Sequence, residues 1–203
     1  HRCLDISLDE SCKRLTARHG YFDNNRLMVS STWHYVFSVD GTVAITIRVE
    51  VSESAPPLPR VGAALRLSQD PGQVSWFGRG PHENYPDRKH SAVFGQWTQS
   101  TPDMHTPYIF PSENGLRCDV SKAQIGRILI QGEFSLGVSQ YSVKQLMAAQ
   151  HEHELIPEDG LFIHIDGFHM GVGGDDSWSP SVKPRYLLTA ATYCWDFSLG
   201  PSN

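Results

Sequence analysis

The stretch Thr42-Val-Ala-Ile-Thr-Ile-Arg-Val-Glu-Val-Ser52 carries the clearest strand signal of the chain. Valine or isoleucine occupies every second position from 43 to 51, and polar residues occupy most of the positions between them. A period of two places the apolar side chains on one face of an extended strand and the polar side chains on the other. The pattern therefore predicts a strand in a sheet that buries one face.

The preceding stretch, Leu27 to Val39, is also rich in strand-forming residues, and Asp40-Gly41 separates it from the strand above. Asp-Gly favours a two-residue turn, because both central positions can take a positive φ. We therefore predict a β-hairpin across residues 27–52 with a two-residue turn at its tip.

Further strand candidates follow at short intervals, and glycine or proline punctuates them. Ser54 to Pro59 holds three prolines and predicts a bend between two sheets, whereas only Val143 to His151 has helical character. Many short strands of this kind predict an all-β fold, a β-sandwich formed by residues 1–203 as a single domain. The candidate strands are Ala63–Leu67, Gln73–Phe77, Ala92–Thr98, Arg127–Gln131, Glu133–Tyr141, Leu161–Asp166 and Tyr186–Leu199.

Composition narrows the class of protein. The chain has 203 residues, of which 39% are hydrophobic and 19% charged, and this suffices for one buried core. Its net charge of -5 and scattered basic residues argue against a nucleic-acid or anionic-membrane partner. No apolar run approaches the roughly 20 residues that cross a bilayer. The four cysteines, at positions 3, 12, 118 and 194, form no C-x-x-C pair, which is typical of reduced thiols in a cytoplasmic protein.

Three loop-like stretches break the strand pattern: Gly78–His90, Pro102–Asp119 and Gly167–Pro184. Their polar and aromatic content makes them the candidate functional segments. The first reads GPHENYPDR from Gly80 to Arg88. Its polar groups could bind sugar hydroxyls, or they could satisfy one another, with Arg88 clamping a carboxylate.

The second loop adds Glu113. This residue could pair with Glu83 as acid and nucleophile, since retaining glycosidases need two carboxyl groups about 5–5.5 Å apart. In the other interpretation Asn114-Gly115 forms a turn that Glu113 braces. Two sets resemble metal ligands, namely His151-Glu152-His153, and His164 and Asp166 with His169, but the polar faces of strands explain them better than a metal site does.

The third loop contains GVGGDDSWSP, from Gly171 to Pro180. Its glycines permit unusual backbone angles and a close approach by another chain, and Asp175 and Asp176 can brace it through backbone amides. Trp178 could then form a platform for the apolar face of a sugar ring. Alternatively, Trp178 anchors its own loop in the core.

Three strings occur in one order: GPHENYPDR at residues 80–88, TPYIFPSENGLRCDV at 106–120 and IDGFHMGVGGDDSWSPSV at 165–182, with ITIRVEV at 45–51 as a weaker match. Together they resemble the carboxyl-terminal domain of the large β-galactosidases of glycoside hydrolase family 2. The resemblance implies a supersandwich similar to galactose mutarotase, truncated here at its amino end. It also implies an adjacent (β/α)₈ barrel, which carries both catalytic glutamates and the magnesium site, so we expect no catalytic residue in this chain.

The same resemblance implies that the parent enzyme hydrolyses terminal β-D-galactosides of the lactose type with retention. Trp178 would contribute to the acceptor or leaving-group subsite, and the main chain of Phe110, Pro111 and Leu146 would form a sodium site. The expected partners are the barrel domain, in the same chain or in a large subunit, the β-galactoside substrate, and further copies of a homo-oligomeric parent.

Two alternatives of different class remain open at this point. A stand-alone carbohydrate-binding or aldose-epimerase-like (mutarotase-like) domain would need a histidine and a glutamate that face one pocket. A purely structural interaction domain would keep Trp178 in its own core.

Overall fold

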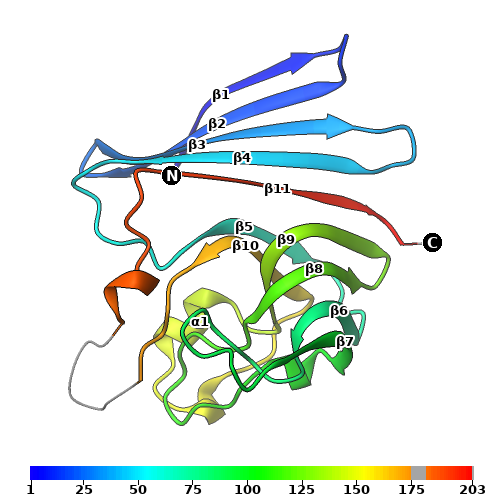
Figure 1. The fold of residues 1–203 in the computed structure, drawn as a ribbon, viewed down its shortest axis with the longest axis vertical. Coiled ribbons are helices and arrows are strands. Elements are labelled where there is room, and N and C mark those ends of the chain that lie inside the picture. Colours follow the sequence, from blue (N-terminus) through cyan, green and yellow to red (C-terminus); the bar gives the residue numbers. More distant parts are fainter. Residues whose placement is uncertain (175–181, 203) are drawn as a thin grey trace.

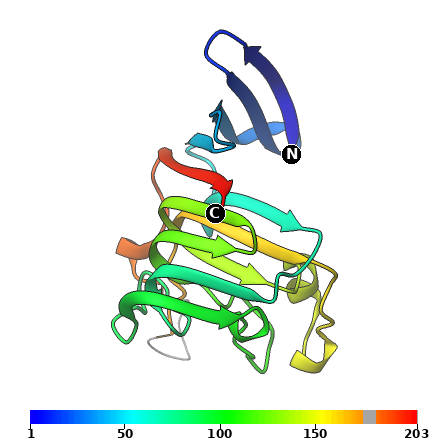
Figure 2. The same cartoon turned by 90° about the vertical axis from the view of Figure 1, so that its right-hand side faces the viewer.

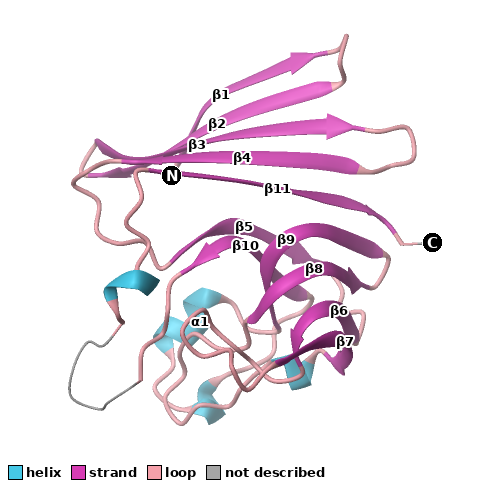
Figure 3. Cartoon of the chain, viewed as in Figure 1, coloured by secondary structure: helices cyan, strands magenta, loops and turns pink. Residues whose placement is uncertain are grey.

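The structure is a computed structural model that describes residues 1–174 and 182–202, and these residues form the predicted all-β fold with little helix (Figures 1 and 3). Helical segments are confined to the loops. The elements are β1 (Arg2–Asp9), β2 (Arg14–Asp23), β3 (Arg26–Phe37), β4 (Val43–Val51), β5 (Arg60–Leu67), β6 (Gln73–Gly80), β7 (Val93–Ser100), η1 (Pro102–Met104), β8 (Arg117–Ile125), β9 (Ile128–Ser139), α1 (Val143–Ala148), η2 (Glu152–Glu154), β10 (Leu161–His169), η3 (Pro184–Tyr186) and β11 (Thr192–Pro201).

The strands form two layers. The first layer has the antiparallel order β1-β2-β3-β4-β11, and the second contains β5, β10, β9, β8, β6 and β7. Figure 1 shows the first layer above the second, and Figure 2 shows the β1–β2 hairpin standing away from the rest of the molecule. The chain passes from β4 in one layer to β5 in the other across residues 52–59, which confirms the predicted bend between sheets.

β9 joins the two layers. Residues 128–132 pair with β11 of the first layer, residues 135–139 pair with β10, and β8 runs along the opposite edge. Gly132 lies at the change of partner with φ +145°, and a Cβ there would lie 2.9 Å from the carbonyl oxygen of Asp196. The prediction of two strands on either side of Gly132 was therefore wrong, because glycine lets one strand continue through this crossing.

The predicted β3–β4 hairpin is confirmed by pairing from Val29–Val51 to Phe37–Val43. The predicted two-residue turn was wrong. Ser38 donates its N–H to Thr42 O (2.9 Å), so three residues lie in the loop between them. Of the loop residues only Gly41 has a positive φ, at +84°. Asp40 instead accepts the Thr42 N–H through its carboxylate (2.9 Å), which closes a longer loop.

The sequence patterns missed three strands. Every residue of β1 is exposed, and β2 mixes polar and apolar residues on both faces, so neither shows a clear buried face. β8 has register shifts between Arg117 and Val120 and between Val120 and Lys122, which interrupt the alternation. The last predicted strand, Tyr186–Leu199, began too early, because Tyr186 ends the 3-10 helix η3 and β11 begins only at Thr192. Only the first part of the predicted helix is helical, as α1.

The core lies between the layers. Ile45, Ile47 and Val49 of β4 are buried as predicted, and they pack in one cluster with the second layer through residues such as Trp76 and Ile163. All four cysteines are free thiols. Among the described residues, no helix is long and apolar enough to span a membrane.

Candidate functional site

The three loop-like stretches come together on one side of the second layer, where Figure 1 shows the green loops that connect β6, β7 and β8 below the strands. Residues 80–88, 105–117 and 169–173 contact one another there, and we call this region the three-loop cluster. The cluster thus brings together described residues from each of the three strings.

Glu83 ties the first loop to the second. Its side chain is 9% exposed, and its Oε1 accepts hydrogen bonds from Arg88 Nη2 (2.6 Å) and from the Tyr108 hydroxyl. Its Oε2 accepts the N–H of Gly115 at 2.8 Å. Burial and the hydrogen bond to Glu83 both raise the pKa of Tyr108. The interpretation that Arg88 clamps a carboxylate is confirmed, and Glu83 is fully occupied in holding the two loops.

Asn84 adds two hydrogen bonds between the first loop and the second, to the backbone of Leu116 and of Cys118. Its backbone N–H donates to Leu116 O (2.8 Å), and its Oδ1 accepts the N–H of Cys118 (2.9 Å). The side chain of Asn84 is completely buried, so both bonds form away from water, where unpaired polar groups would be costly. Burial also raises the pKa of the Cys118 thiol to about 11, which keeps it protonated at neutral pH.

Arg117 is the buried cation of the cluster, with 1% of the residue exposed. It donates to Pro81 O (2.9 Å), Gly115 O (2.8 Å) and Gln99 Oε1 (2.9 Å), and its guanidinium lies 5.4 Å from the centroid of the Trp76 ring. Burial lowers its pKa to about 10, so it stays charged at neutral pH. Three carbonyl oxygens on three segments therefore depend on one side chain.

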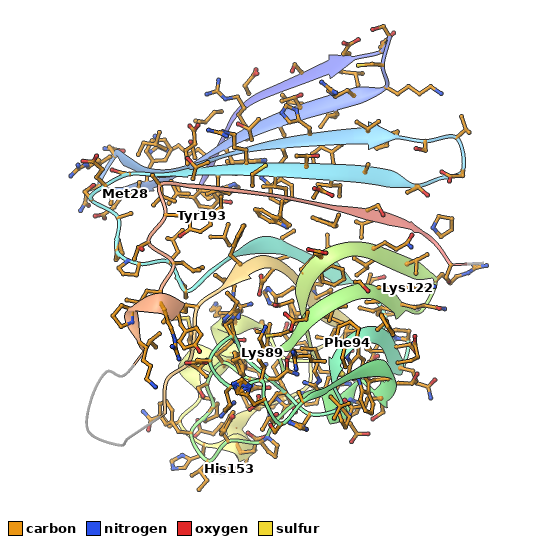
Figure 4. The ribbon with its side chains drawn as sticks, in the orientation of Figure 1. Met28, Lys89, Phe94, Lys122, His153 and Tyr193 are labelled. Carbon is orange, nitrogen blue, oxygen red and sulfur yellow. The ribbon has the colours of Figure 1, made fainter. Side chains whose placement is uncertain are left out.

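A second polar contact lies at the edge of the cluster, around Lys89, which Figure 4 labels among the loops below β8 and β9. Lys89 Nζ lies 2.9 Å from Asp119 Oδ2, and Arg79 Nε lies 2.6 Å from the same oxygen. The two cations lower the pKa of Asp119 against the opposing effect of burial. Asp119 has φ +54° and lies at the register shift between Arg117 and Val120 that interrupts β8.

The third loop meets the first at Asp87. The carboxylate of Asp87 accepts the N–H of Val172 at Oδ1 (3.1 Å) and the N–H of Gly173 at Oδ2 (2.8 Å). A Cβ on Gly171 would lie 2.6 Å from Cγ of Asp87, so the close approach requires glycine at that position. Gly173 and Gly174 have positive φ values of +69° and +94°. Gly171 thus allows a close approach to Asp87 of the same chain, whereas a Cβ on Gly174 would meet nothing within 4 Å.

Glu113 braces the cluster against β5 and β10. It forms an ion pair with Arg60, and its Oε1 lies 3.9 Å from Nε2 of His169. Glu113 therefore holds the second loop to β5 and β10 and not, as predicted, the Asn114-Gly115 turn, where the Asn114 side chain accepts the N–H of Thr106 and donates to Ser112 O. Glu83 and Glu113 each have a cation of their own, Arg88 and Arg60, and this arrangement does not favour an acid and nucleophile pair.

Behind Glu113 lies a buried carboxyl group. Asp166 is 1% exposed, neither of its side-chain oxygens has a hydrogen-bond partner, and the nearest cation is Arg60 Nη1 at 3.6 Å. Burial raises the pKa of Asp166 to about 7, although Arg60 opposes this shift. Burial likewise lowers the pKa of His169, whose ring meets Tyr85 at a centroid distance of 5.5 Å.

The prediction that the histidines of the two candidate sets lie on the polar faces of strands was wrong: His151 and His153 lie in a loop around η2, and on β10 Asp166 and His169 are buried and burial lowers the pKa of His164. His105 Nε2 lies 3.0 Å from Glu152 Oε1, and His151 Nδ1 lies 3.1 Å from Glu154 Oε1. Within residues 1–174 and 182–202, no group of three or more His, Cys, Asp or Glu side chains could hold a metal ion.

The residues predicted for the sugar subsite and the sodium site lie in three different segments. Trp178 lies outside the described residues. Phe110 is 65% exposed and Pro111 is buried in the second loop, whereas Leu146 lies in α1. In a continuing helix the Gln150 N–H would bind the carbonyl oxygen of Leu146, four residues earlier. Here Gln150 donates its N–H to Glu154 Oε2 instead (2.9 Å) and does not occupy that oxygen. Backbone carbonyl oxygens are suitable ligands for a hard cation such as sodium. The sodium site at Phe110, Pro111 and Leu146 stays a prediction.

Sequence reasoning missed the roles of Arg60, Arg117 and Asp87. Arg60 follows the proline-rich bend and contacts Glu113, which is 53 residues away. Arg117 stands between Leu116 and Cys118, which are both buried, and an arginine flanked by buried positions is a signal that could have singled it out.

Comparisons with known proteins place the chain in a family. Residues 7–199 match the family described as Beta galactosidase small chain. A Beta-galactosidase of Aeromonas hydrophila is 44% identical over 200 residues, which cover 97% of this chain and 20% of that protein. A Beta-galactosidase of Yersinia enterocolitica is 46% identical over 202 residues, which cover 97% of this chain and 19% of that protein.

Among solved structures, a galactose mutarotase related enzyme from Lactobacillus acidophilus matches with a TM-score of 0.47 and 9% sequence identity, over 98% of this chain and 72% of that chain. The family match covers nearly the whole chain, and the chain therefore belongs to the Beta galactosidase small chain family. It spans about a fifth of the length of the curated relatives that it matches.

Proposed function

We propose that this chain is the carboxyl-terminal part of a β-galactosidase that hydrolyses terminal non-reducing β-D-galactose residues of lactose-type substrates with retention. The observation that carries the proposal is the family match over residues 7–199, combined with relatives that are about five times longer. The catalytic glutamates, and the magnesium ion that the resemblance implies, would lie in the remaining four-fifths of the enzyme. The proposal includes a cytoplasmic, homo-oligomeric parent.

The geometry of the cluster supports a positioning role for this chain. A retaining glycosidase needs one carboxylate free to attack the sugar and one free to exchange a proton. Glu83 is bound by Arg88, Tyr108 and Gly115, and Glu113 is bound by Arg60, so neither is free in this sense. The cluster would instead hold the third loop so that Trp178 can stack on the sugar at the acceptor or leaving-group subsite.

The carbonyl oxygens of Phe110, Pro111 and Leu146 would hold the sodium ion of the parent enzyme. When bound, the ion would supply positive charge and fix the backbone around it. The second loop that contains Phe110 and Pro111 is the one that Glu83 and Arg117 already hold, so the ion would add to the same support.

We expect the isolated chain to show no turnover of a chromogenic β-galactoside, whereas the intact enzyme does. The reason is that the groups for nucleophilic attack and proton transfer lie outside it. The measurement is the initial rate of chromophore release at equal molar concentrations of the two proteins. Appreciable turnover by the isolated chain would show that catalysis does not lie elsewhere.

In the intact enzyme, Trp178→Ala should weaken acceptor binding and galactosyl transfer to glucose by about tenfold, because a stacked aromatic platform contributes on the order of 1 kcal/mol or more. Cleavage of the galactoside should change less. The measurements are the ratio of transfer product to hydrolysis product and the rate of aglycone release. Trp33→Phe in the first layer is the control, and a selective loss of cleavage with unchanged transfer would contradict this role.

The mutarotase-like alternative needs a histidine and a glutamate that face an open pocket. His169 and Glu113 come within 3.9 Å, but the side chain of His169 is only 4% exposed and Arg60 holds Glu113. Among the residues that the structure describes, this pair does not favour the mutarotase-like alternative over the β-galactosidase part.

A further inference from the structure

We propose that Arg60 is a pH-dependent latch, which fastens the second loop to β5 through Glu113 while Asp166 is protonated and leaves Glu113 when Asp166 ionises. The latch acts on the second loop, residues 105–117, and does not depend on the function proposed above. It consists of one guanidinium and two carboxyl groups, and all three residues belong to the described part of the chain.

Two carboxyl groups share the guanidinium of Arg60. Arg60 is the first residue of β5, its Nη2 donates to Glu113 Oε2, and its Nη1 lies 3.6 Å from Asp166 Oδ2. A separation of 3.6 Å is too long for a hydrogen bond. Arg60 is therefore paired with Glu113, and Asp166 lies beside this ion pair with neither of its oxygens hydrogen-bonded.

Asp166 is confined against the backbone of β5. It is 1% exposed, and it pairs with Gly62 across the β5–β10 ladder, whose two strands Figure 1 shows next to each other. A Cβ on Gly62 would collide with Asp166 Oδ1 and would lie 2.8 Å from the Cα of Asp166. The carboxyl group thus occupies the space that a side chain at position 62 would need. A charge on Asp166 must therefore be compensated by a group that moves toward it.

His169 does not hold Glu113. The Nδ1–H of His169 donates to Met170 O (2.7 Å), so in the neutral ring Nε2 carries a lone pair. Burial lowers the pKa of His169, which keeps the ring neutral at neutral pH. Nε2 faces Glu113 Oε1 at 3.9 Å, and two acceptors form no hydrogen bond with each other. Glu113 therefore depends on Arg60.

Ionisation of Asp166 changes the demand on Arg60. The charged groups around Asp166 are Arg60 from β5 and Glu113 from the second loop, while His164 and His169 of β10 have pKa values that burial lowers. Burial raises the pKa of Asp166 to about 7, so below this pH the carboxyl group is neutral. Above it, a buried anion repels Glu113 and competes for the guanidinium, because an unpaired buried charge is strongly unfavourable.

The effect is local to the second loop. Glu113 lies between Phe110, which is 65% exposed, and Gly115, whose N–H binds Glu83 and whose carbonyl oxygen binds Arg117. Release of Glu113 should therefore loosen the residues before Gly115 and leave Gly115 itself in place. The loop loosens as the pH rises through about 7 and tightens as the pH falls.

The test is hydrogen exchange of the intact enzyme, measured by mass spectrometry on peptides that span residues 105–114 and 115–125. Exchange rates at about pH 5.5 and about pH 8.5 are divided by the intrinsic rates of unstructured peptides at the same pH, which gives the protection of each segment. We expect the protection of residues 105–114 to fall about tenfold between the two pH values, and that of residues 115–125 to change less than about twofold. Equal protection of residues 105–114 at both pH values would overturn the inference.

Asp166→Asn separates the latch from a general effect of pH. Asparagine has the size of the protonated carboxyl group but cannot ionise, so residues 105–114 should keep their low-pH protection at both pH values, within about twofold. A fall as large as that in the native enzyme would mean that Asp166 does not control the loop. Exchange of residues 43–51 in β4 checks that the variant is folded.

Glu113→Gln is the second variant, and it leaves Asp166 unaltered. Without the ion pair to Arg60, residues 105–114 should have low protection at both pH values. Native protection at the lower pH would show that Glu113 does not fasten the loop. Glu50→Gln is the matched control, because Glu50 also pairs with an arginine, Arg48 at 3.2 Å, but on the exposed surface of the first layer. This control should reproduce the pH response of the native enzyme.

Discussion

Replacement of Arg117 by methionine is expected to lower the free energy of unfolding by about 3–5 kcal/mol, because three acceptors lose their donor and each buried acceptor left unpaired costs about 1–3 kcal/mol. Methionine fills a similar volume but donates no hydrogen bond. The change would leave Pro81 O, Gly115 O and Gln99 Oε1 without the donor that holds them, and the hydrogen bond to Gly115 O is fully buried. The measurement is denaturant unfolding, followed by the fluorescence of Trp76 and the other tryptophans.

The control for Arg117 is Arg48→Met on β4. The side chain of Arg48 is 55% exposed, and its partner is Glu50 at 3.2 Å on the same strand. Exposed ion pairs contribute little, so this variant should change the free energy of unfolding by no more than about 0.5–1 kcal/mol. If Arg117→Met were as mild as Arg48→Met, water would be able to replace the guanidinium, and Arg117 would not be what joins the loops.

The second large effect concerns the dependence of stability on pH at Asp166. Burial raises the pKa of this carboxyl group from 3.8 to about 7 in the folded protein. Between these two values the unfolded chain releases the proton while the folded protein retains it. The contribution of Asp166 to stability is therefore fully present below about pH 4 and is lost as the pH rises to about 7. The loss is at most about 4 kcal/mol, since one pKa unit corresponds to about 1.4 kcal/mol.

The measurement is the free energy of unfolding of the native chain and of Asp166→Asn at several pH values between about 4 and 8. We expect the native chain to lose stability relative to the variant as the pH rises, because asparagine has no proton to release. Asp23→Asn, a substitution at an exposed position, serves as control. Its free energy of unfolding should change with pH in the same way as that of the native chain. A constant difference between the native chain and Asp166→Asn would mean that Asp166 ionises as it would in water.

The local architecture followed from sequence wherever one face of a strand is buried. The alternation from 43 to 51 predicted β4 and its inward face, because a period of two has only one arrangement on a sheet. β1 and β8 were not predicted, and the reasons differ for the two strands. β1 buries none of its residues, and β8 buries Arg117 and Cys118 side by side around a bulge, so neither shows a regular alternation.

The candidate site was predictable in part. The nearby pair Glu83 and Arg88 could be foreseen, because the two residues lie five positions apart in one loop. The contacts Arg60–Glu113 and Asp87–Gly173 span 53 and 86 positions, and no local pattern encodes a pairing at such a separation. The three strings indicated that their residues belong together, but they did not indicate which atoms meet.

The sequence by itself determined the all-β class, the β3–β4 hairpin, the bend at the prolines and the three loops that matter, because each follows from local periodicity or from the backbone limits of glycine and proline. Only the tertiary structure decided that Glu83 and Glu113 are braces, that Asp166 is a buried acid and that Asp87 holds the glycine-rich segment. These roles depend on desolvation and on charges brought together from distant positions, and neither exists until the chain has folded.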